Sequence, residues 1–223
     1  MRRLLMLLLS LLLLIPCSTS LAAQREPYLY LDIPFSAISF EELADHLLAK
    51  KQVVLEQPYS TADASGLKEF GQTFLFSAYY DPNGAINRIV LKPEGEAFAS
   101  GKAFAELVKQ QANQFVDLDA QLSALYGEPD IRYFWAGKDK HRMTLYEAYM
   151  PDENDWTVEQ LISVFENDRV LRARSVWNNV ILEFWPDGAK RTPRGYLTKL
   201  TLSYENRTID GPIEILFRYP EAE

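Results

Sequence analysis

The chain has 223 residues, and its 31 acidic and 23 basic side chains give a net charge of −8 at neutral pH. A content of 48% hydrophobic and 13% aromatic residues excludes a natively disordered chain and predicts a folded core. The acidic balance lacks the basic footprint of nucleic-acid-binding proteins, so nucleic acid and anionic membrane surfaces are poor candidates for partners.

The first 23 residues have the pattern of a secretory signal peptide. Arg2 and Arg3 precede an apolar run at residues 4–15. As a helix this run would be about 18 Å long, against roughly 30 Å for the hydrocarbon core of a bilayer. Small residues at Ala22 and Ala23 then provide a cleavage signal. We predict cleavage near Ala22/Ala23, and a periplasmic or secreted protein with no stable membrane anchor.

Cys17 leaves one alternative open, a lipoprotein anchored through that residue. Bacterial lipoproteins place a small residue directly before the modified cysteine, whereas Pro16 stands there in this chain and ends the apolar helix. With the signal peptide, residues 1–23, the chain loses its only cysteine and two arginines. The mature protein then has a net charge of −10 and cannot form a disulfide within its own chain.

Periodicity predicts eleven elements in the mature chain. Three helices are expected, at residues 40–50, 102–126 and 157–167. Eight strands are expected, at residues 73–80, 86–91, 131–135, 143–149, 170–177, 180–185, 196–205 and 213–219.

The helix ends are marked by capping residues. Thr157 and Gln160 form a capping box ahead of the third helix, because each side chain can bond the backbone N–H of the other residue. Gly127 ends the second helix. Turn residues likewise predict connections at 186–188 and at the basic stretch 190–194, which we expect to be a solvated loop between two strands.

Alternation of apolar and polar residues along the strands predicts antiparallel pairing with one buried and one wet face. The expected fold class is α+β, with an antiparallel sheet or sheets of hairpins and a C-terminal meander packed against about three helices. We expect residues 24–223 to form a single globular domain, with a possible sub-boundary near 100–103 or 151–156.

The sequence contains no motif for nucleophilic catalysis, phosphate binding or dinucleotide binding. His46 and His141 stand in no metal-ligand spacing. Acidic residues at 152–155 fail the pattern of a calcium loop, because Trp156 and Thr157 take its fifth and sixth positions. We therefore assign no catalytic residue, no cofactor and no metal.

One strand carries a candidate recognition patch. Arg172 and Arg174 alternate with apolar residues in the strand at 170–177, and we expect them on its wet face. The next strand can place Glu183 and Trp185 beside them. Because arginine and tryptophan are enriched at binding surfaces, we predict a partner-binding patch of Arg172, Arg174 and Trp185.

These observations favour an exported, soluble, non-catalytic binding or accessory protein of the bacterial envelope, with an unknown protein or envelope ligand as its partner. The alternative is a cofactor-independent hydrolase acting on cell-wall or carbohydrate material through a pair of carboxylates. With 31 acidic residues in the chain, the sequence selects no such pair.

Mass spectrometry of the exported protein tests the predicted processing. We expect an N-terminus at Ala23 or Gln24 and no attached lipid, because the small residues at the end of the apolar run direct cleavage there. A mature protein that begins at a diacylated Cys17 would contradict this prediction.

Overall fold

The computed structural model describes residues 42–43, 45–46, 61–80, 85–140, 143–147 and 156–205. The elements described over their full length are β1 (Thr61–Glu69), β2 (Gln72–Tyr80), β3 (Ile86–Pro93), β4 (Phe98–Ala99), α3 (Lys102–Tyr126), β5 (Ile131–Gly137), β6 (Met143–Glu147), α4 (Val158–Asp168), β7 (Val170–Trp177), β8 (Val180–Thr192) and β9 (Gly195–Glu205). The predicted signal peptide and the strand at 213–219 lie outside the described residues.

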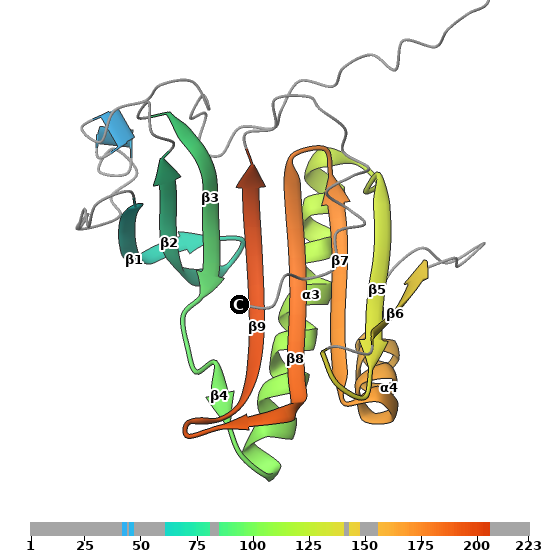
Figure 1. Ribbon diagram of the computed structural model, residues 1–223. Helices are drawn as coiled ribbons and strands as arrows, with labels where there is room; N and C mark the ends of the chain where they lie inside the picture. The colour runs from blue at the N-terminus through green and yellow to red at the C-terminus, as the bar shows by residue number, and fades with distance from the viewer. Residues whose placement is uncertain are drawn as a thin grey trace, which may run out of the picture.

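The strands form one antiparallel sheet (Figure 1). Eight of them follow the order β1-β2-β3-β9-β8-β7-β5-β6, and β4 pairs with β9. An antiparallel sheet with helices packed on it is therefore confirmed. Two helices, α3 and α4, are described completely. Of the helix expected at 40–50, residues 42–43 and 45–46 are described, and they are helical.

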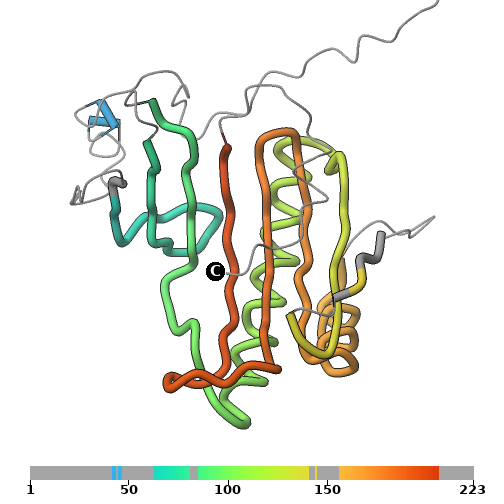
Figure 2. The backbone as a smooth tube through the Cα atoms, in the orientation of Figure 1, coloured from blue at the N-terminus to red at the C-terminus, as the bar shows by residue number. Residues whose placement is uncertain are grey.

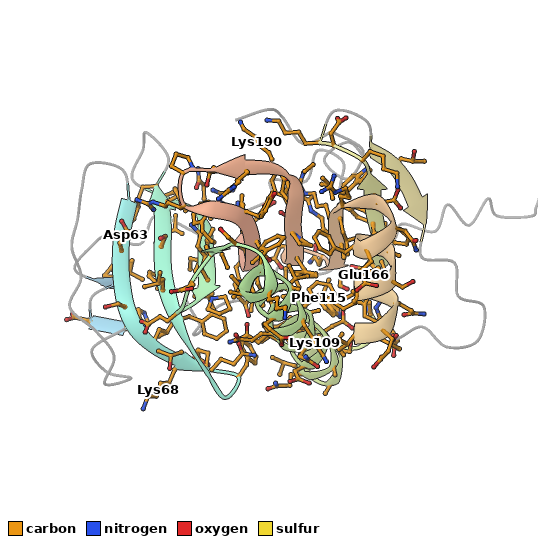
Figure 3. The ribbon with its side chains drawn as sticks, turned by 90° about the horizontal axis from the view of Figure 1, so that it is seen from below. Asp63, Lys68, Lys109, Phe115, Glu166 and Lys190 are labelled. Carbon is orange, nitrogen blue, oxygen red and sulfur yellow. The ribbon has the colours of Figure 1, made fainter. Side chains whose placement is uncertain are left out.

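Helices α3 and α4 cover the same face of the sheet (Figure 3). The apolar stripe of α3 is buried against the central strands, and it includes Phe104, Val108, Phe115, Leu118 and Leu122. The ring of Phe115 lies 6.0 Å from that of Phe184 on β8, measured between centroids. The predicted capping box starts α4, since Thr157 Oγ1 accepts from Gln160 N and Gln160 Oε1 accepts from Thr157 N. The main core thus lies between the helices and this face.

Two of the four tryptophans belong to this core. Trp156 Nε1 donates to Ser175 Oγ on β7 at 2.8 Å, and Trp177 Nε1 donates to the carbonyl of Gly127 at 2.8 Å. Because both indole donors are bonded inside the fold, these tryptophans have a structural role.

Strand β8 continues through the connection predicted at residues 186–188, so that expectation is wrong. A bulge follows Asp187, whose Oδ1 accepts hydrogen bonds from the backbone N–H groups of Ala189 (3.0 Å) and Lys190 (3.1 Å). The carboxylate thus supplies acceptors for N–H groups that the bulge removes from the ladder. The predicted basic loop is mostly strand, and the turn to β9 is limited to residues 193–194.

The bulge is also attached to the end of α4. Gly188 N donates to the carbonyl of Arg169 at 2.8 Å. A Cβ at Gly188 would lie 3.0 Å from that oxygen and 3.0 Å from Phe165 Cζ, so the backbone approaches the helix closely. Beyond the bulge, the β8–β9 hairpin turns sharply away from the line of the strand (Figure 2).

The hairpin requires a glycine at position 195. Gly195 has a φ of +115°, and a Cβ there would lie 2.3 Å from the carbonyl oxygen of Ala99 on β4. Gly195→Ala should lower the free energy of unfolding by about 2–3 kcal/mol, because it adds backbone strain and a steric clash. Urea unfolding measures this change.

Gly71→Ala is the matched control. Gly71 has a φ of +70°, but nothing lies within 4 Å of an added Cβ. Strain alone should therefore cost about 1 kcal/mol. Equal losses in the two variants would show that the contact between Gly195 and β4 does not constrain the hairpin.

Candidate functional site

The face of the sheet turned away from α3 and α4 carries a second, smaller apolar cluster, formed by Tyr133, Trp135, Val176 and Ile181 with Ile131 beside them. We call it the opposite face. Among the described residues no helix covers it (Figure 3). Arg172 and Arg174 lie on this face, away from the helices as we expected, but the expectation that they are exposed is wrong, since their side chains are 11% and 14% exposed.

Both arginines bind the same carboxylate oxygen. Glu183 Oε2 accepts from Arg172 Nε at 2.8 Å and also from Arg174 Nε. The Glu183 side chain is 8% exposed. Arg174 Nη1 donates in addition to the hydroxyl of Tyr133 on β5, at 2.9 Å. Register explains the contact, because Arg174 is opposite Glu183 in the β7–β8 ladder and opposite Tyr133 in the β5–β7 ladder.

Two tryptophans pack against the arginines. The guanidinium carbon of Arg172 lies 5.1 Å from the centre of the Trp185 ring and 5.5 Å from that of Trp135. Arg174 lies 5.5 Å from the Trp135 ring. Within this distance the ring attracts a cation. The structure thus brings the predicted residues Arg172, Arg174 and Trp185 together.

The pKa shifts show that the cluster is charged. Burial by itself raises the pKa of Glu183, but the charges of Arg174 and Arg172 outweigh it and hold that pKa below its usual value. Burial lowers the pKa of Arg174, yet Glu183 and Tyr133 raise it above its usual value. Burial raises the pKa of Tyr133, which stays a neutral phenol. The cluster therefore holds two positive charges and one negative charge.

Stability alone does not account for this arrangement. Burying three charged groups requires removing water from each, and apolar residues of similar volume often give equal or greater stability. The cluster also keeps one positive charge in excess. Within the described residues, the terminal amino groups of Arg172 donate no hydrogen bond. The buried donor Trp185 Nε1 likewise has no partner there. The site is thus equipped to accept an anion.

The cluster lies in a groove of about 750 Å³ on the opposite face. Of the described residues that line it, seven are cationic and three are acidic, although the whole chain is acidic. Besides the two arginines, the cations are Arg88, Lys92, Lys140, Lys190 and Lys199. Figure 3 shows Lys190, on the bent β8–β9 hairpin, on the side of the sheet away from Lys109 of α3. The groove is therefore positively charged, although the net charge of the whole chain is negative.

Among the described residues, no group of three or more histidines, cysteines and acidic residues could hold a metal ion. Within the same part of the chain, no helix has the length and hydropathy needed to span a membrane. No protein-family model, curated protein or solved structure matches the chain. A functional inference therefore depends on the groove itself.

Removing the shared carboxylate tests the charge cluster. Glu183→Gln should lower the free energy of unfolding by about 2–4 kcal/mol, because it leaves two partly buried arginines side by side without an anion. The neutral triple variant Arg172→Gln/Arg174→Gln/Glu183→Gln should lose less, since no charge is then left unpaired. Equal losses in urea unfolding would show that charge balance is not the cause.

The pH dependence gives a second measure of the same cluster. The pKa of Glu183 is lowered in the folded protein, so its contribution to stability is complete above the usual value of 4.5 and is lost as pH falls through the lowered pKa. The parent should therefore lose stability relative to the triple variant as pH falls below about 5. A stability difference that does not change between pH 7 and 3 would contradict this assignment.

Proposed function

We propose that the protein is an exported, non-catalytic binding module of the bacterial envelope whose ligand carries an anionic group. The observation that carries this proposal is the excess positive charge of the cluster formed by Arg172, Arg174 and Glu183 at the base of the groove. The signal-peptide pattern supports export.

Arginine chemistry supports an oxyanion as the group that is bound. A guanidinium presents a planar fork of N–H donors that matches a carboxylate, phosphate or sulfate. Glu183 accepts from the Nε atom of Arg172, and the rings of Trp185 and Trp135 lie near its guanidinium, so that among the described residues its terminal amino groups have no hydrogen-bond partner. The donors are thus ordered before a ligand arrives, and less entropy is lost on binding.

The alternative of a carboxylate-pair hydrolase has less support. Of the three described acidic residues that line the groove, two lie on β8, Glu183 and Asp187. A general acid needs a raised pKa, whereas the arginines lower that of Glu183. Asp187 Oδ1 is occupied by two backbone N–H groups of the bulge. Both carboxylates are thus engaged in holding the groove together.

Thermal unfolding with simple oxyanions tests the proposal. At matched ionic strength, we expect at least one of phosphate, sulfate and galacturonate to raise the melting temperature, and neutral galactose to leave it unchanged. An anion at ten times its Kd stabilises the fold by about 1.4 kcal/mol, which corresponds to about 3–6 °C for a chain of this size.

The charge-neutral triple variant should show no such rise. Its matched control is Lys109→Gln on α3, which changes the net charge by the same amount at an exposed position on the helix side. This control should respond as the parent does. The proposal is wrong if none of the oxyanions raises the melting temperature, or if the triple variant responds like the parent.

A further inference from the structure

A second cationic subsite lies at the other end of the groove. Arg88 and Lys92 on β3 are exposed and line the groove with Tyr79 of β2. The guanidinium carbon of Arg88 lies 4.6 Å from the centre of the Tyr79 ring. Among the described residues, no ion pair engages Arg88 or Lys92. This end thus repeats the combination of arginine and aromatic ring found at Arg172.

Across the sheet, the two subsites are separated by three inter-strand distances. Arg88 and Lys92 belong to β3, and Arg172 and Arg174 to β7, with β9 and β8 between them. Neighbouring strands lie about 4.8 Å apart, so the two subsites are about 14 Å apart across the sheet. A single carboxylate, phosphate or sulfate cannot reach both.

The floor between the subsites is polar and includes two short hydroxyl side chains. Thr201 and Ser203 on β9 line the groove there, opposite Glu183 and Ile181 in the β8–β9 ladder. Their hydroxyl groups can donate and accept hydrogen bonds. Each subsite also has an aromatic ring beside its arginine, Trp185 at Arg172 and Tyr79 at Arg88. The groove therefore offers a cation and an aromatic ring at each end, with hydroxyl groups and Lys199 on β9 between them.

We propose that the ligand is an acidic oligosaccharide that spans both subsites, an inference that rests on the proposed function. Acid groups on separate sugar units would pair with the arginines at the two ends. Sugar hydroxyls would bond the floor, and the apolar faces of the sugar rings would pack on the aromatic side chains. Each feature of the groove then has a counterpart in the ligand.

An extended acidic peptide fits this groove less well. Peptides that bind sheets gain most of their affinity from main-chain hydrogen bonds at an exposed edge strand. The groove lies instead on the face of β3, β9, β8 and β7, whose neighbouring strands pair with one another. Recognition here depends on side chains, which suits a ligand whose polar groups are distributed around its rings.

Calorimetric titration with oligogalacturonates of one to six units tests this inference. We expect affinity to rise by at least 100-fold once the oligomer is long enough to engage both subsites, because the second contact becomes intramolecular. Arg88→Gln/Lys92→Gln should lose this gain, so that the hexamer binds no more tightly than the monomer. Lys102→Gln/Lys109→Gln on α3, with the same change of charge, should keep it.

Other outcomes of these binding experiments show whether the two-subsite inference or the proposed anion site is wrong. A hexamer that binds no more tightly than the monomer, or equal binding of a methyl-esterified hexamer, would overturn the two-subsite inference and leave the proposed anion site standing. Tighter binding of oligoglutamate than of the acidic sugars would indicate a peptide ligand instead. If neither galacturonate nor its oligomers bind, while phosphate or sulfate still stabilises the parent, the oligosaccharide inference alone is wrong.

Discussion

One carboxylate oxygen, Oε2 of Glu183, holds two guanidinium groups side by side on the opposite face of the sheet. This contact exists only if β7 and β8 pair in their observed register, because a shift of β7 by one residue would turn both arginines toward the helices and away from Glu183. The register is secured by the core on the other face, where Phe184 of β8 packs against Phe115 of α3. Core packing on the helix side therefore fixes the register that brings the three charged side chains together on the opposite face.

Local signals were sufficient to predict most of the elements. Gly127 and the Thr157–Gln160 capping box locate helix ends, since capping depends on residues next to each other in the chain. Strand β1 was missed because its polar sequence, with a bulge at Gly66, shows no alternation. The extent of β8 was also missed. A Pro-Asp-Gly sequence normally ends a strand, but here the carboxylate of Asp187 accepts backbone hydrogen bonds and the strand continues.

The candidate site was predictable only within one hairpin. The proximity of Arg172, Arg174 and Trp185 follows from the short turn between β7 and β8. Tyr133 and Trp135 were missed, since β5 reaches β7 across the intervening α4 and no local pattern records that pairing. The same pairing explains why the arginines are mostly buried, because two aromatic side chains from β5 lie against them. The groove cations Arg88 and Lys92 come from still more distant parts of the chain.

The attachment of the β8 bulge to α4 gives the sheet a mechanical role. Gly188 N donates to the carbonyl of Arg169, the residue that follows α4, and two positions later the same strand carries Lys190 into the groove wall. A displacement of the helix end is thus transmitted through one strand to the opposite side of the sheet. The position of Lys190 in the groove wall therefore also depends on Phe165 and Arg169, although neither residue lines the groove.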